Sequence, residues 1–224
     1  LYKTIAQNFN IQLDGYVEVS FDAFKTVVND VGGVEIELTE SEAAYLNATN
    51  YIRPAKYRTV KAGKHTLNGA QALGYCRIRK YAKGIQPVTP NGQIDDYGRT
   101  WRQRNVINAI FNKAKGTSLP KLMDMAQTIL SKYVTTDLNS QDIIGYMKDV
   151  VMMGTMEIYQ LQIPMDGYFT TQANYQAPGS TTNLGSVILP DMTTNTAALK
   201  DFIFKYKGTP GQEYTYGGST AAPQ

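Results

Sequence analysis

The chain has 224 residues, of which 42% are hydrophobic and 18% charged, a composition typical of a globular protein. Its single cysteine and single histidine exclude an internal disulfide, a CxxC motif and a multi-histidine zinc site. The net charge of +3 is uneven, because residues 53–104 carry twelve Lys or Arg against two Asp. This segment has a net charge of +10 and the rest of the chain −7, which predicts a strongly anionic partner.

The N-terminal part alternates between helical and extended patterns. Residues 2–9 are expected to be the last part of a helix. Residues 16–21 are rich in β-forming residues with an alternating apolar pattern, which predicts a strand. A helix capped by Asp22 follows and ends at two glycines. Residues 34–38 alternate as a second strand, so this order predicts helices packed on a sheet.

The middle of the chain combines short helices with an irregular basic region. A short helix is expected from Thr39 or Ser41 to about Ala48. Residues 50–65 are basic and irregular, and residues 68–75 favour another short helix.

A loop and the longest helix follow. Residues 80–94 contain two glycines and two prolines, which predicts a flexible loop at the mouth of a site. Asp95 or Asp96 is expected to begin a helix that runs to about Lys115 and ends at Gly116.

The remaining sequence predicts further helices, further strands and a loose tail. Helices are expected over 119–133, 140–153 and from Asp191 or Thr194 to about Phe204, and strands over 156–163 and 186–189. One domain is expected over residues 1–206, followed by a flexible Gly/Pro/Thr-rich tail over 207–224.

The longest helix has an unusual charge pattern. At about 100° per residue its later turns form one apolar stripe, and Arg99 and Gln103 lie on that stripe. An arginine directed inward is costly unless an anion meets it, and a helix N-terminus also favours phosphate. The alternative is an ordinary ion pair between Arg99 and Asp95 or Asp96.

Two more arginines precede this helix. Arg77 and Arg79 are expected on an extended segment, where residues two apart project to one face. Together with Arg99 they form a set that can bind pyrophosphate, because the guanidinium fork matches the spacing of phosphate oxygens.

Two motifs make the chain recognisable. Residues 67–79 read Leu-Asn-Gly-Ala-Gln-Ala-Leu-Gly-Tyr-Cys-Arg-Ile-Arg, and residues 96–103 read Asp-Tyr-Gly-Arg-Thr-Trp-Arg-Gln. This pair, separated by a variable loop, resembles the LytR–CpsA–Psr family, and weaker matches extend the resemblance over roughly residues 1–205. The resemblance implies an α/β fold, a three-layer α–β–α sandwich around a mixed central β-sheet.

The resemblance also implies a function. Members are extracytoplasmic, usually membrane-anchored phosphotransferases that move a glycopolymer, such as teichoic acid or a polysaccharide, from a polyprenyl-pyrophosphate carrier to peptidoglycan, with Mg²⁺ at the pyrophosphate. By resemblance, the catalytic residues are Asp96 and Arg99. The pyrophosphate contacts implied in the same way are Arg77, Arg79, Arg99, Arg102 and Gln103.

The resemblance is incomplete at one end. The family's first segment, with its magnesium-binding aspartates, another arginine and the membrane anchor, is expected upstream of Leu1. No metal ligand is therefore assigned within the chain, and the transfer activity of this chain by itself is expected to be impaired.

Two other functions fit the basic segment. The first is a non-catalytic module that binds polyprenyl phosphate or an anionic polymer. The second is a nucleic-acid-binding regulator, but the basic residues are spread over a loop, an extended segment and a helix, without a helix-turn-helix signature. No nucleic acid is therefore expected as a partner.

Overall fold

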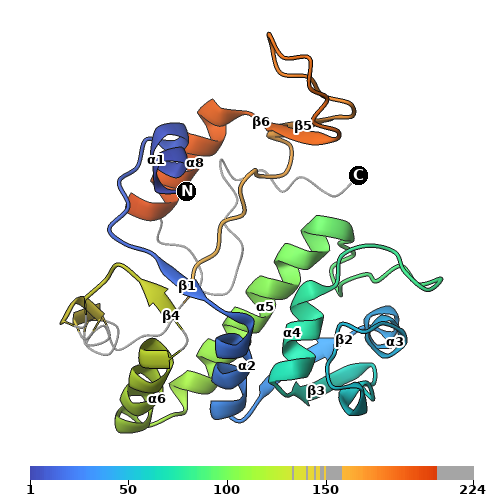
Figure 1. Ribbon diagram of the computed structural model, residues 1–224, viewed down its shortest axis with the longest axis vertical. Helices are drawn as coiled ribbons and strands as arrows, with labels where there is room; N and C mark the ends of the chain where they lie inside the picture. The colour runs from blue at the N-terminus through green and yellow to red at the C-terminus, as the bar shows by residue number, and fades with distance from the viewer. Residues whose placement is uncertain (133, 140, 144, 147–148, 150–157, 206–224) are drawn as a thin grey trace. The chain divides into compact units, whose positions relative to one another are not determined.

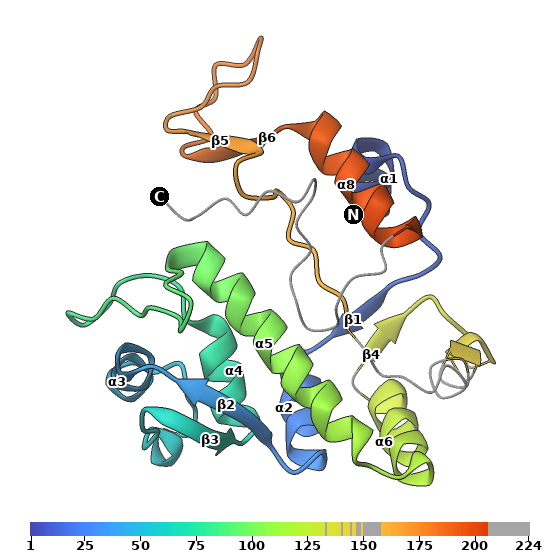
Figure 2. The same ribbon diagram turned by 180° about the vertical axis from the view of Figure 1, so that it is seen from behind.

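The structure is a computed structural model, drawn from two sides in Figures 1 and 2. The residues it describes are 1–132, 134–139, 141–143, 145–146, 149 and 158–205. The chain divides into two compact units, residues 15–156 and residues 1–14 with 157–224.

The larger unit contains a β-hairpin of β2 (Val34–Leu38) and β3 (Gly63–Leu67), paired antiparallel from Val34 opposite Leu67 to Leu38 opposite Gly63. In β2 the apolar side chains are buried and the two glutamates between them are exposed, which confirms the predicted alternation. β3 was not predicted, because Gly-Lys-His-Thr-Leu lacks apolar alternation and is extended through its pairing with β2.

Helix α2 (Phe21–Asp30) begins two residues earlier than a cap at Asp22 would place its start. The cap is Ser20, whose Oγ accepts a hydrogen bond from the Ala23 backbone N–H at 3.1 Å. Asp22 lies inside the first turn and forms an ion pair with Lys25 at 2.6 Å, so its prediction as the cap was wrong.

Two capping boxes fix the next helices. In α3 (Glu40–Ala48) the Thr39 side chain accepts from the Glu42 N–H, and Glu42 accepts from the Thr39 N–H. Asn68 and Gln71 repeat this arrangement at the start of α4 (Gly69–Arg77). A short 3₁₀ helix, η1 (Ala55–Tyr57), lies between them in the chain.

Helix α4 extends to Arg77, two residues beyond its predicted end. Tyr75 and Cys76 are buried in its last turn, and Ile78 follows as the C-cap. Arg77 is therefore helical, and the prediction that Arg77 and Arg79 alternate along an extended segment was wrong. Packing of the last turn into the core favours the additional helical residues.

The long helix α5 (Asp95–Lys115) has the predicted bounds and packs against α4 and β2 (Figures 1 and 2). Helix α6 (Leu119–Lys132) follows, and α2 packs against it. Strand β1 (Val17–Val19) pairs antiparallel with β4 (Val134–Thr136), which brings together segments more than a hundred residues apart. The helix expected over 140–153 falls largely outside the described residues.

One hydrophobic core lies between the hairpin and helices α2, α3, α4 and α5. Its largest fully buried apolar side chains are Tyr45, Tyr75, Ile36, Leu38, Leu46, Ile52, Leu67 and Ile78. Cys76 is buried there too, and burial raises the pKa of its thiol to about 12, so it is a protonated core residue.

The predicted α/β class is confirmed. Within the described residues the strands pair as three separate two-stranded antiparallel sheets, β1–β4, β2–β3 and β5–β6, and not as one central sheet. Of the strand expected over 156–163, residues 158–163 are described and contain only a single bridge residue, Gln160.

The smaller unit contains α1 (Tyr2–Phe9), the hairpin of β5 (Phe169–Gln172) and β6 (Val187–Pro190), and α8 (Met192–Phe204). Asp191 caps α8 as predicted, accepting from the Thr194 N–H at 3.1 Å. The tail expected over 207–224 lies outside the described residues. None of the helices among the described residues combines the length and hydropathy needed to cross a bilayer.

Gly69 sets how closely α4 approaches α2. A Cβ added to Gly69 would overlap the Lys25 carbonyl oxygen and lie 2.7 Å from the Lys25 Cα. Gly69→Ala is therefore expected to destabilise the protein by about 1–3 kcal/mol or more in chemical denaturation, because the backbone of α2 must shift. Gly116→Ala is the matched control, since its nearest contact would be an ordinary 3.7 Å. Equal effects of the two substitutions would contradict this account of the α2–α4 contact.

Candidate functional site

Asp96 joins two arginines from different parts of the larger unit. Its Oδ2 accepts a hydrogen bond from Arg79 Nε at 2.9 Å, and its Oδ1 lies 2.6 Å from Arg99 Nη2. Arg79 follows the end of α4, whereas Asp96 and Arg99 lie in the first turns of α5. One carboxylate therefore holds two guanidinium groups side by side.

The spacing along α5 explains this arrangement. Asp96, Arg99 and Gln103 are related by steps of three and four residues, which places them along one face of the helix. Further along that face, Gln103 Nε2 donates to the Cys76 carbonyl oxygen at 3.4 Å. The predicted residues of the two motifs are thus brought together where the end of α4 meets the start of α5.

Arg77 is exposed and held by aromatic rings. Its guanidinium carbon lies 5.4 Å from the ring centroid of Phe21 and 5.4 Å from that of Tyr51, both within cation–π range. Tyr51 is in turn stacked on the buried Tyr45, with ring centroids 5.7 Å apart. Arg77 is therefore positioned by its contacts with two aromatic rings, and neither contact involves a carboxylate. In the sequence it precedes Arg79 by two residues.

The Arg79–Asp96–Arg99 group has an excess positive charge and remains open to solvent. The side chains of Arg79 and Arg99 are 41% and 36% exposed. Each guanidinium has five N–H donors, and the single Asp96 carboxylate occupies only some of the ten. Two guanidinium charges against one carboxylate leave a net positive site, which suits an oxyanion such as a phosphate.

Arg102 is placed differently from its predicted role. It is fully buried, and its Nε donates to Glu42 Oε1 at 2.7 Å, while Nη1 and Nη2 donate to the carbonyl oxygens of Ile78 at 3.4 Å and Pro87 at 3.3 Å. The predicted pyrophosphate contact at Arg102 is therefore corrected to a structural role, because a group without solvent exposure offers no access to a ligand.

The arginine that α5 directs into the core is Arg102, and Arg99 forms the helix-start ion pair that was the alternative interpretation. Gly98, Arg102 and Val106 are the buried residues of the first half of α5, whereas Gln103 is exposed. The stripe judged from the later apolar turns is rotated by about 100°, roughly a quarter of a turn, from the face of α5 that is buried near Asp96.

Glu42 is the residue that the sequence did not reveal. It is fully buried, and burial raises the pKa of its carboxyl while the hydrogen bond from the Thr39 backbone and the Arg102 guanidinium lower it. The only sequence signal was the Thr39-x-x-Glu42 spacing, which indicates a capping box and says nothing about a partner sixty residues away. Phe21 and Tyr51 had no sequence signal for their contact with Arg77.

The start of α3 also holds the loop that precedes α5. Thr39 Oγ1 donates to the Val88 carbonyl oxygen at 2.8 Å, and the Val88 N–H donates to Ser41 Oγ at 3.0 Å. With Arg102 bound to the carbonyl oxygen of Pro87, residues 87 and 88 are fixed from two sides. The expected flexible loop over 80–94 is thus anchored at these positions.

Among the residues that the structure describes, no group of three or more His, Cys, Asp or Glu side chains is arranged to hold an ion. Both oxygens of Asp96 contact guanidinium groups. The described residues therefore assign no ligand to a magnesium ion.

The comparison with known families gives the class of protein. The model of the LytR_cpsA_psr family matches residues 1–187. The chain therefore belongs to the LytR–CpsA–Psr family, as its two motifs predicted.

Two curated relatives carry the same functional name, polyisoprenyl-teichoic acid–peptidoglycan teichoic acid transferase. TagU of Enterococcus faecalis is 30% identical over 178 residues, which are 77% of this chain and 50% of TagU. TagV of Bacillus subtilis is 29% identical over 136 residues, 61% of this chain and 31% of TagV. The chain thus spans between a third and a half of these relatives.

Two solved structures share the fold. The crystal structure of B. subtilis TagV has a TM-score of 0.57 and 24% identity, over 89% of this chain and 68% of TagV. The Lin1025 protein of Listeria innocua has a TM-score of 0.56 and 22% identity, over 90% of this chain and 73% of Lin1025.

The Glu42–Arg102 pair gives a stability prediction. Glu42→Ala is expected to reduce the free energy of unfolding by about 3–5 kcal/mol, because it leaves a buried guanidinium without its counter-charge. Replacing both residues, by Glu42→Leu and Arg102→Met, is expected to recover much of this loss. Urea denaturation measures both effects.

The exposed Glu35 provides a control, because its pair with Lys64 is held at 3.5 Å on the surface. Glu35→Ala is expected to change stability little. A Glu42→Ala variant as stable as Glu35→Ala would contradict the buried-pair assignment.

Proposed function

We propose that this chain contributes the pyrophosphate-binding part of a phosphotransferase that moves a cell-wall glycopolymer from a polyprenyl-pyrophosphate carrier to peptidoglycan. The observation that carries the proposal is the pair of exposed guanidinium groups that Asp96 holds together at the junction of α4 and α5. The names of TagU and TagV, which describe a polyisoprenyl-linked donor and a peptidoglycan acceptor, support this choice.

The chemistry that this group supports is a displacement at phosphorus. A hydroxyl oxygen of the acceptor forms a bond to the phosphorus that carries the glycopolymer, and the bond from this phosphorus to the bridging oxygen breaks. Polyprenyl phosphate leaves, and the hydroxyl proton passes to solvent. Arg79 and Arg99 stabilise the negative charge on the phosphate oxygens, and Gln103 and Arg77 extend the donor set along the two helices.

Asp96 is a positioning residue in this proposal. Because both of its oxygens contact guanidinium groups, it orients Arg79 and Arg99 and is not assigned a proton-transfer step. Arg102 is assigned no contact with the substrate in this proposal, because its ion pair with Glu42 is fully buried.

Magnesium, a membrane anchor and an extracytoplasmic location belong to the same proposal. Magnesium suits a pyrophosphate because phosphate oxygens are among the ligands that this ion prefers. A cell-surface location follows from the peptidoglycan acceptor in the names of the relatives.

A non-catalytic module that binds the same carrier would use the same arginines, and turnover of a labelled donor separates the two functions.

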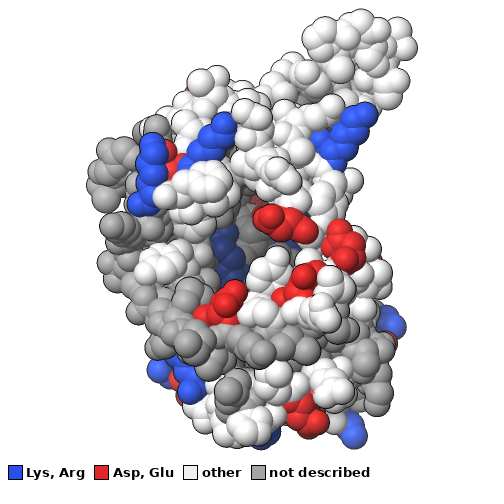
Figure 3. All heavy atoms as spheres, turned by 90° about the vertical axis from the view of Figure 1, so that its left-hand side faces the viewer, with Lys and Arg blue, Asp and Glu red and all other residues white. Residues whose placement is uncertain are grey.

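A nucleic-acid-binding function is less well supported. The basic residues of segment 53–104 are distributed over η1, β3, α4 and α5, whereas a recognition helix would gather them on one element. On the one face drawn in Figure 3, the described basic and acidic side chains lie in small separate groups.

Calorimetric titration with a short-chain polyprenyl pyrophosphate, with and without Mg²⁺, tests the proposed site. Arg79→Ala and Arg99→Ala are each expected to weaken binding by about 10- to 100-fold, because each removes charge-assisted hydrogen bonds worth about 1.5–3 kcal/mol. Arg77→Ala is expected to weaken binding in the same direction.

Lys113→Ala is the matched control, since it removes one positive charge from the last turn of the same helix. It is expected to leave the affinity nearly unchanged. Binding that is indifferent to Arg79 and Arg99, or that depends equally on Lys113, would overturn the proposed site.

A further inference from the structure

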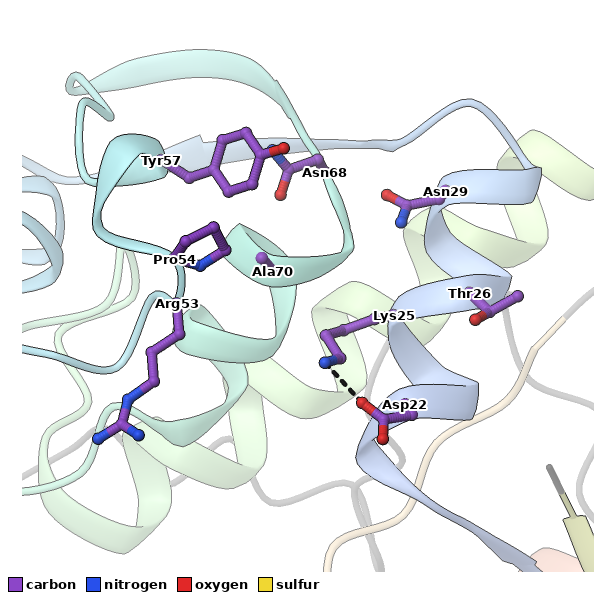
Figure 4. Close-up of a pocket in the computed structure, with 9 residues that line it drawn as sticks. All are labelled: Asp22, Lys25, Thr26, Asn29, Arg53, Pro54, Tyr57, Asn68 and Ala70. Atoms are coloured by element: carbon purple, nitrogen blue, oxygen red, sulfur yellow. Dashed lines mark ion pairs between the residues drawn. The ribbon is translucent and has the colours of Figure 1, made fainter.

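A second surface feature of the larger unit is an open hollow of ≈ 540 Å³ between α2 and the segment that follows α3. Figure 4 shows its two walls, one from α2 and the other from residues 53–57, with the start of α4 between them. The lining residues are Asp22, Lys25, Thr26, Asn29, Arg53, Pro54, Tyr57, Asn68 and Ala70. Its volume lies within the range of about 300–1,000 Å³ that is typical of ligand sites.

The hollow is built on a fixed base. The Gly69 N–H donates to Asn29 Oδ1 at 2.8 Å, which ties the start of α4 to α2. Asn68 Oδ1 accepts a hydrogen bond from the Gln71 N–H at 3.0 Å. The side-chain oxygens of Asn29 and Asn68 therefore both accept backbone hydrogen bonds within the protein. Each asparagine also carries an NH₂ group with two donors, whose direction is fixed by the bond made by its oxygen.

The lining favours a neutral, hydroxyl-rich ligand over a compact phosphate. The charge of Lys25 is offset by Asp22 at 2.6 Å, so Arg53 is the unbalanced charge among the lining residues. The remaining polar groups are amides and hydroxyls, which both donate and accept. The Tyr57 ring adds an aromatic surface of the kind that packs on the C–H face of a sugar ring, and the Lys56 ammonium lies over this ring at 5.1 Å from its centroid.

The hollow is close in the chain to the two aromatic residues that contact Arg77. Phe21, whose ring contacts Arg77, precedes the lining residue Asp22 in α2. Tyr51, the other ring on Arg77, lies two residues before Arg53 in the opposite wall. Both walls of the hollow therefore continue into the residues that hold Arg77.

We propose that this hollow binds a stretch of saccharide chain and aligns it with the pyrophosphate at Arg77, Arg79 and Arg99. This inference rests on the proposed function, since it assigns part of one substrate to a site beside the arginines. The saccharide has two sources with the same hydroxyl-rich chemistry, the glycan of peptidoglycan and the glycopolymer itself.

The test uses lipid-free probes on the whole chain. Soluble peptidoglycan glycan fragments and carrier-free glycopolymer fragments are titrated separately and followed by NMR. Tyr57→Ala and Arg53→Ala are each expected to weaken binding of one of these probes at least fivefold. Lys61→Ala, which removes one positive charge from the same basic segment outside the hollow, is expected to have no effect.

The outcomes separate this inference from the proposed function. Loss of saccharide binding in the Tyr57 and Arg53 variants, with polyprenyl pyrophosphate binding retained, supports the hollow, and the probe that responds identifies the source. If neither probe binds the unmodified chain, or if binding is indifferent to Tyr57 and Arg53, the saccharide assignment is overturned while the arginine site stands. Pyrophosphate binding that is indifferent to Arg79 and Arg99 refutes the proposed function instead.

Discussion

The ion pair between Glu42 and Arg102 is the interaction on which the site depends. Both side chains are fully buried, and their contact joins α3 to α5 across the core. Arg102 also binds the backbone between Arg77 and Arg79 through the Ile78 carbonyl oxygen. A buried charge pair contributes little net stability but is costly to break, so it fixes one arrangement of these elements. The orientation of α5 relative to the end of α4 follows from that arrangement.

The arginines of the two motifs consequently divide their roles by burial. Arg102 supports the fold from inside, whereas Arg79 and Arg99 stay exposed and are paired by Asp96. Arg77 is contacted by the aromatic rings of Phe21 and Tyr51. Holding like charges close together costs free energy, and the single carboxylate of Asp96 offsets part of that cost while leaving the site positive. An anionic ligand completes the neutralisation, which is why we place the pyrophosphate there.

Local signals in the sequence predicted much of this. Short helices were expected to start at Thr39 or Ser41 and near Asn68, where α3 and α4 begin, and the alternation of residues 34–38 marked the buried face of β2. The two motifs identified the family and the residues that meet around Asp96. The orientation of α5 could not be predicted, because the buried partner of Arg102 is Glu42, sixty residues earlier in the chain. The strand β3 was missed for a similar reason, since its pairing with β2 determines its structure.

Arginine side-chain NMR during titration with inorganic pyrophosphate tests the central claim most directly. The claim is that Arg79 and Arg99 bind the anion and that Arg102 does not. We predict that the Nε resonances of Arg79 and Arg99 shift together along one saturation curve, while that of Arg102 stays unchanged because its Nε is bonded to Glu42 in the core. A shift at Arg102 of the same size, or no shift at Arg79 and Arg99, would contradict the account.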